Sequence, residues 1–148
     1  MFQLIIIPIL VGLITQAIKL MTDGIPNNFS WRHLINDYGG MPSAHTAYAS
    51  ALTTMVALRE GLDSAAFAIS LILMIIIIRD AIGFRQEIGR NAILTNKIAK
   101  EVFKNKKVEY LQERIGHTLP QILVGLIIGC GLSVVLFLFT NLIPLFLL

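Results

Sequence analysis

The chain has 148 residues, of which 55% are hydrophobic and 14% charged, and its mean hydropathy is +0.75. Ordinary soluble domains carry about 25% charged residues, and one core of this size could not cover so much apolar surface. The apolar residues are also gathered in long runs. Composition therefore excludes an ordinary soluble domain and indicates a single membrane-embedded domain over residues 1–148.

The net charge of +3 could suggest binding to nucleic acid. Aromatic residues are not interleaved with the basic ones, however, and basic residues in a membrane protein more often mark a cytoplasmic face beside anionic lipid. We therefore expect the lipid bilayer as a partner and no nucleic acid. The single cysteine, Cys130, lies in an apolar run and excludes an intrachain disulfide.

Four apolar segments predict membrane spans, for which a helix needs roughly 20 mostly apolar residues. They are residues 2–21, 42–58, 64–78 and 120–139. The first has no basic start and no clear cleavage site, which favours a span over a signal peptide. The second is the least hydrophobic, because His45, Tyr48 and Thr53 interrupt it. Such a helix is expected to lie among other helices rather than to face lipid.

The basic residues are distributed unevenly over the loops between these spans. Eleven of the twelve fall in the first loop with the adjoining span end or in the third loop, and only Arg59 falls in the second. With four spans, the first and third loops share one side of the membrane. The positive-inside rule then predicts that these long loops are cytoplasmic and that both termini lie outside.

The third loop, residues 79–119, is too long for a simple turn. Apolar residues recur in it at roughly helical spacing with basic residues between them, as in Phe84, Ile88 and Ala92. This pattern predicts an amphipathic helix on the cytoplasmic surface, the alternative being a solvated basic arm. The predicted fold class is thus an all-α integral membrane protein with about four transmembrane helices and a cytoplasmic amphipathic helix between spans three and four.

Two motifs with chemical potential stand at the starts of the second and fourth spans. Gly39 and Gly40 are followed by Met-Pro-Ser43-Ala-His45. Pro and Ser are common in the first turn of any helix. Paired glycines, however, let the backbone approach a ligand, a helix N-terminus attracts anions, and an ionisable residue just inside a membrane is usually functional.

The second motif is Gly-His117-Thr118-Leu-Pro, in which Thr118 can cap the fourth span. Spans two and four run in the same direction, so both histidine-bearing starts are expected at one face. Spans one and three end at that face and bring further polar residues, namely Gln16, Lys19, Arg79 and Asp80, with Arg85 close behind.

This set of residues suits a phosphate ester. Cations and helix N–H groups would hold the anion, one histidine would attack phosphorus, and the other would protonate the leaving oxygen. Two histidines could also suggest a metal, but the only obvious carboxylate nearby is Asp80, which can instead pair with Arg79 or Arg85. Metal-ligand spacing is missing, so no metal site is expected.

Taken together and in order, three motifs resemble the divergent branch of the type 2 phosphatidic acid phosphatase superfamily, which is related to acid phosphatases and vanadium-dependent haloperoxidases. They are Gly-Gly-Met-Pro-Ser-Ala-His45, Arg79-Asp-Ala-Ile-Gly-Phe-Arg85, and Gly-His117-Thr with Gly125 after it. The resemblance covers the chain from Gln16 to Gly129.

The resemblance implies a role for each matching residue. The wider superfamily uses K-x6-R-P, P-S-G-H and S-R-x5-H-x3-D. By analogy His117 would be the nucleophile, His45 the general acid, and Ser43 and Lys19 phosphate-binding residues. Arg79 or Arg85 would replace the arginine of the third motif, and Arg32 is a loose candidate for that of the first. Asp80, Gly40 and Thr118 would orient the site.

One departure from the family pattern bears on activity. Gln121 stands where the divergent branch often has Glu. An amide can still orient an imidazole, but it cannot stabilise the imidazolium with charge.

The sequence thus predicts a metal-independent and cofactor-free membrane phosphatase that acts on a lipid phosphate or diphosphate through a phosphohistidine. Two alternatives stay open: a phospholipid-binding scaffold of the same fold without turnover, and a lipid-transport component. Formation of a homo-oligomer also stays open.

Overall fold

The computed structural model describes residues 2–22, 39–104 and 108–146, and every regular element in these ranges is a helix. The helices are α1 (Phe2–Thr22), α3 (Ala44–Glu60), α4 (Ala65–Ile82), α5 (Phe84–Val102) and α6 (Leu119–Phe146). The prediction of an all-α membrane fold is confirmed. Arg32, the loose candidate for a phosphate-binding arginine, lies outside the described residues.

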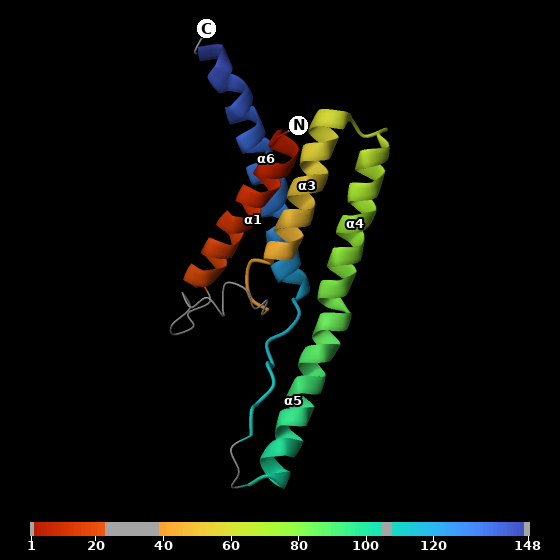
Figure 1. Ribbon diagram of the computed structural model, residues 1–148, viewed down its shortest axis with the longest axis vertical. Coiled ribbons are helices and arrows are strands. Elements are labelled where there is room, and N and C mark those ends of the chain that lie inside the picture. Colours follow the sequence, from red (N-terminus) through yellow and green to blue (C-terminus); the bar gives the residue numbers. More distant parts are fainter. Residues whose placement is uncertain (1, 23–38, 105–107, 147–148) are drawn as a thin grey trace.

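Helix α3 occupies the centre of the bundle, in contact with α1, α4 and α6 (Figure 1). The expectation that the least hydrophobic segment lies among other helices is therefore confirmed. Helices α3 and α6 begin at the same end of the bundle, where α1 and α4 end (Figure 1). This arrangement brings the two histidine motifs to one end of the bundle.

Small residues allow α3 to approach its neighbours closely, as is common where helices pack within membranes. A side chain on Gly12 of α1 would collide with the Tyr48 ring. On α6, a side chain on Gly129 would collide with Ser50 and Ala47, and Gly125 lies directly against the backbone of Ser43. The α3–α6 contact thus depends on glycines one turn apart.

The apolar core between α1, α3 and α6 is small and is built around Ile7, Val11, Ala47, Ala51 and Met55. Most large apolar side chains point outward instead, as expected for a protein whose solvent is lipid. Among the described helices, three are long and apolar enough to cross a bilayer: Phe2–Thr22, Ala65–Val102 (α4 and α5 together) and Leu119–Leu142. Helix α3, with its polar residues, is not one of them.

The third loop contains a helix, α5, where the amphipathic pattern predicted one. Its position on the cytoplasmic surface stays a prediction. Figure 1 shows that α5 continues along the direction of α4 rather than turning aside. The reason is local, because helical hydrogen bonds run through the junction at Gly83. The Gly83 N–H donates to the Arg79 carbonyl, and the Glu87 N–H donates to the Gly83 carbonyl.

After α5 the chain returns toward the bundle as an extended segment, residues 108–118, that lies along α5 (Figure 1). Asn96, which is buried, binds both backbone groups of Leu111, with its Oδ1 accepting from the N–H and its Nδ2 donating to the carbonyl, each at 2.9 Å. A side chain on Gly89 would come within 2.8 Å of the Ile115 carbonyl oxygen. This segment, which no sequence pattern predicted, delivers His117 to the start of α6.

Candidate active site

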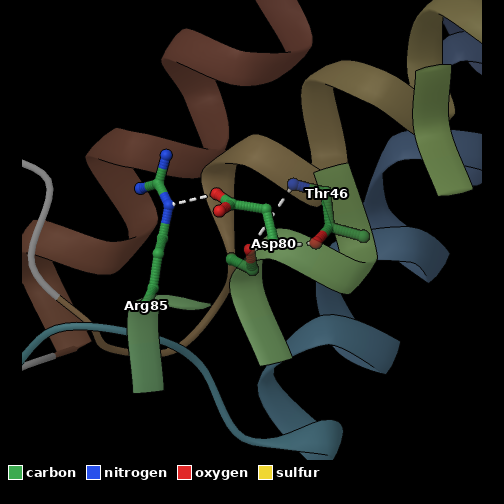
Figure 2. Close-up of polar contacts among 4 residues, drawn as sticks. Thr46, Asp80 and Arg85 are labelled. Atoms are coloured by element: carbon green, nitrogen blue, oxygen red, sulfur yellow. Dashed lines mark hydrogen bonds and ion pairs between the residues drawn. The ribbon is translucent and has the colours of Figure 1, made fainter. Parts of the chain in front are cut away.

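His45 lies in the first turn of α3, which begins after Ser43. The Ser43 Oγ caps this helix by accepting hydrogen bonds from the N–H of Thr46 at 3.4 Å and from its hydroxyl at 3.0 Å (Figure 2). Ser43 is fully buried and its N–H donates to the Gln121 carbonyl in the first turn of α6. The structure thus places Ser43, a predicted phosphate-binding residue, in a capping role that fixes the start of α3.

His117 is held by its backbone at the meeting point of three elements. Its N–H donates to the Ala81 carbonyl at the end of α4, at 3.1 Å. Its carbonyl accepts from the Gln86 side chain of α5, at 2.7 Å. Gly116 before it has a φ of +92°, a conformation that L side chains rarely adopt. The glycine of the Gly-His-Thr motif is therefore needed for the turn that presents His117.

The two histidines line the same cavity of about 190 Å³. The polar side chains around it come from α3, α4, α5 and the return segment, and apolar residues of α4 complete the wall. The lining residues are His45, Ile76, Ile77, Asp80, Ala81, Arg85 and His117. The expectation that both histidine-bearing helix starts lie at one face is confirmed, and both histidines line one cavity. No sequence spacing alone could show it, because the motifs lie in different helices.

Asp80 and Arg85 form an ion pair at the wall of this cavity, with 2.6 Å between Asp80 Oδ2 and Arg85 Nε (Figure 2). The pair bridges the α4–α5 junction, and both side chains are partly buried. Asp80 therefore pairs with Arg85, one of the two partners that the sequence left open. Arg79 is exposed and does not line the cavity.

Lys19 is almost completely buried, at 1% exposure, near the end of α1. Its positive charge acts on both His45 and His117. The charge of Arg85 also disfavours protonation of His117, whereas the charge of Asp80 favours protonation of His45. The predicted phosphate-binding lysine thus belongs to the same electrostatic cluster as the histidines.

The His117 imidazole is 2% exposed, and neither ring nitrogen has a hydrogen-bond partner within the described part of the chain. Burial lowers the pKa of His117 to about 4, and the charges of Lys19, His45 and Arg85 act in the same direction. The ring is therefore neutral near pH 7. A neutral imidazole keeps a lone pair, which is what a nucleophile requires.

Gln121 does not orient His117. Its side-chain Oε1 accepts a hydrogen bond from the Thr118 N–H at 2.9 Å, and the Ile122 N–H donates to the Thr118 carbonyl. This is half of a capping box, in which the third residue of a helix satisfies the N–H of its cap residue. Gln121 and Thr118 line a separate cavity of about 240 Å³ together with Gly40.

The described residues hold no group of three or more His, Cys, Asp or Glu side chains suited to a metal ion. The contacts of Ala81 and Gln86 with the His117 backbone were not foreseen. Neither residue type signals such a role, because one contact uses a main-chain carbonyl and the other an ordinary amide.

The sequence model of the Divergent PAP2 family matches residues 2–132, which include every residue of the cavity. The chain belongs to this family. It is also similar to the uncharacterized membrane protein YuiD of Bacillus subtilis, with 36% identity over 134 residues that cover 82% of this chain and 85% of the relative. No solved structure matches the chain significantly.

Membership in the Divergent PAP2 family agrees with the apolar helices of the structure, so the chain is a membrane protein. The resemblance inferred from the three ordered motifs is confirmed. The family also makes a phosphatase-related function plausible, since all three motifs lie within the matched residues.

Proposed function

We propose that this protein is a membrane phosphatase that hydrolyses a lipid phosphate or diphosphate through a phosphohistidine on His117. The observation that carries the proposal is the shared cavity, in which a buried, neutral His117 lies with His45 and the Asp80–Arg85 pair. Two histidines that line one cavity support this proposal, because transfer between a nucleophile and a general acid requires both groups at one substrate.

The reaction would proceed in two steps. A ring nitrogen of His117 attacks phosphorus as the bond to the leaving oxygen breaks, and His45 gives its proton to that oxygen. Water then attacks the phosphohistidine, His45 takes up the proton that the water loses, and the phosphorus–nitrogen bond breaks to release inorganic phosphate. Arg85 and Lys19 would stabilise the charge on the phosphoryl oxygens.

The charges around the cavity support this assignment of roles. Burial and the charge of Lys19 disfavour the protonated form of both rings. Arg85 adds to this effect at His117, whereas the Asp80 carboxylate opposes it at His45. Two like groups whose surroundings differ in this way are typical of an acid and its partner in catalysis. His117 thus suits the nucleophile and His45 the proton donor.

The apolar wall of the cavity supports a lipid substrate. Ile76 and Ile77 of α4 line it, and Ile76 is 58% exposed on the outer surface of that helix. A phosphate could therefore lie between the histidines while its hydrocarbon chain runs along α4 into the bilayer.

The direct test is phosphate release by purified protein in detergent micelles, across a panel of lipid phosphates and diphosphates. We expect His117→Ala to abolish release and Arg85→Ala to raise KM strongly. Arg79→Ala is the matched control, because Arg79 is exposed outside the cavity, and it should leave release unchanged. Equal rates of phosphate release by wild type and His117→Ala would show that His117 is not the nucleophile.

We further propose that the site faces the cytoplasm and that both termini lie outside, because basic residues gather in the first and third loops. Single cysteines at Lys104 and Asp63, introduced after replacement of Cys130, should react with an impermeant reagent from opposite sides of the membrane. Lys104 should react from the cytoplasmic side. Reaction of both from one side would refute this topology.

A phospholipid-binding scaffold without turnover is the second candidate, and the position of Gln121 favours it. Gln121 caps α6, and no carboxylate hydrogen-bonds the His117 ring within the described residues. Saturable binding of a lipid phosphate without release of phosphate by any member of the panel would select this function.

A further inference from the structure

The cavity that would receive a phosphate already contains a carboxylate. Asp80 lines it beside both histidines, and its partner Arg85 lies on the same wall. An anion that enters must therefore share a small, partly apolar space with the Asp80 charge, and like charges repel strongly where water is scarce. The ion pair also means that the charge of Arg85 is already balanced in part by Asp80.

We infer that a phosphate-type dianion enters this cavity together with one proton, and that His45 holds that proton. This inference rests on the proposed function for the identity of the anion, and it adds how the general acid obtains its proton. His45 lines the cavity together with Asp80. In the empty cavity, burial and the charge of Lys19 act against protonation of His45, and the Asp80 carboxylate acts in its favour. With a dianion bound, the His45 ring has negative charge both on the anion and on Asp80, an arrangement that favours the imidazolium.

The other groups around the cavity leave His45 as the site for this proton. Lys19 of α1 and Arg85 of α5 already carry positive charge; Lys19 acts on both histidines, and Arg85 acts on His117. His117 is buried and would have to attack phosphorus as a neutral ring. The proton taken up with the anion is then the proton that reaches the leaving oxygen. Binding of each substrate would thus convert His45 to its acid form. The anion and one proton therefore bind together.

Sulfate is a suitable probe, because it is a tetrahedral dianion over the whole range from pH 6 to pH 9 and cannot be hydrolysed. Isothermal titration of the wild-type protein in two buffers with different heats of ionisation measures the protons taken up with it. We expect an uptake of about one proton. The dissociation constant for sulfate should rise about tenfold for each pH unit on the alkaline side, as one linked proton requires.

Two variants test the residues involved. His45→Gln should bind sulfate with no proton uptake, and Asp80→Asn should reduce the uptake well below one proton, because the carboxylate that favours the imidazolium is gone. Glu87→Gln is the matched control: Glu87 forms an exposed ion pair with Arg90 beyond the cavity, and its variant should behave as the wild type. His45→Gln still decides the question if Asp80→Asn fails to fold.

Phosphate release by wild type on the same preparation separates this inference from the proposed function. Release together with sulfate binding that takes up no proton, or with no saturable sulfate binding, would overturn the inference and leave the phosphatase standing. If His45→Gln abolishes proton uptake but wild type releases no phosphate, the inference holds for a phosphate-binding site. The proposal of a phosphatase is then overturned. Uptake that persists in His45→Gln would overturn the inference.

Discussion

The starts of α3 and α6 present one histidine each, but the chain holds these two starts in different ways. The α3 start is buried inside the bundle, where Ser43 caps the helix and packs against Gly125. The α6 start is held by polar backbone contacts with Ala81 and Gln86. One hydrogen bond, from the Ser43 N–H to the Gln121 carbonyl, joins the two starts.

This difference teaches that helix packing sets the position of His45, whereas the α5 helix and the return segment set that of His117. Changes in the apolar bundle should therefore affect folding first. Changes in α5 or the return segment should leave the bundle folded and act on His117. Substitutions in the two regions should therefore have different consequences.

The largest effect is expected from Gly129→Leu. Its side chain would collide with Ser50 and Ala47 of α3, and overpacking of this kind costs about 3 kcal/mol. Thermal unfolding followed by size-exclusion chromatography in detergent should show a large loss of stability. Gly131→Leu is the matched control, because nothing lies within 4 Å of a side chain at that position. Equal behaviour of the two variants would contradict the packing of α3 on α6.

Gly116→Ala should displace His117 without unfolding the bundle. The new side chain would come within 2.7 Å of the Gln86 backbone nitrogen, at a φ of +92°. Misplacement by about 1 Å can cost about a hundredfold in rate, so we expect a loss of that order in kcat. Gly61→Ala has a similar φ of +87° but open space around it. A similar loss of activity in Gly61→Ala would show that backbone strain, rather than the contact near His117, is responsible.

Asn96→Ala should loosen the return segment along α5. It removes both hydrogen bonds to Leu111 and one to Glu113, at a cost of about 2 kcal/mol. Hydrogen exchange over residues 108–118 should become faster while the bundle stays protected. The exposed Asn91 on the same helix serves for comparison, and Asn91→Ala should leave exchange unchanged. Unaltered exchange in Asn96→Ala would show that these bonds do not hold the segment.

The titration of His117 tests its burial directly. Its pKa is lowered to about 4 by burial and by nearby positive charges, whereas an unfolded histidine titrates near 6.5. Between these values the unfolded chain binds more protons, so protonation of His117 opposes folding as the pH falls from 6.5 toward 4. Nitrogen-15 spectra of labelled protein should show a neutral ring at pH 5.5. An imidazolium at that pH would contradict the buried position.

The smallest effect is expected from Gln121→Glu. A carboxylate can accept the Thr118 N–H as the amide does, and a negative charge in the first turn of a helix adds about 0.5 kcal/mol of stability. The rate of phosphate release should stay within about twofold, since Gln121 does not hydrogen-bond the His117 ring. A large gain in kcat would mean that residue 121 reaches the imidazole after all, as the family pattern suggested.

Much of the fold could be predicted from the sequence because apolar runs fix where helices lie in a bilayer. Helices occur where spans 2–21 and 42–58 and the amphipathic segment were expected, as Phe2–Thr22, Ala44–Glu60 and α5. Of these, Ala44–Glu60 is not among the candidate membrane spans. The last span continues to Phe146 although Pro144 interrupts its pattern. The return segment escaped prediction because it is held by single polar contacts, such as those of Asn96, that leave no periodic pattern.

The candidate site was predictable to the extent that it depends on helix starts. Counting the spans placed His45 and His117 at one end of the bundle, and the structure brings them to one cavity. The choice of Arg85 over Arg79 depended on how helical hydrogen bonds cross Gly83. The capping role of Gln121 depended on whether its side chain turned toward Thr118 or toward His117, which spacing along the chain does not determine.

The most direct test of the proposed chemistry is to trap the phosphoryl group on the protein. A lipid phosphate labelled with phosphorus-32 should be mixed with wild type and quenched under alkaline conditions, in which phosphohistidine survives, and the labelled peptide identified by mass spectrometry. We predict an acid-labile label on His117 that is lost in His117→Ala and accumulates when hydrolysis is slowed. Label on His45 instead, or rapid phosphate release that never passes through a labelled protein, would contradict it.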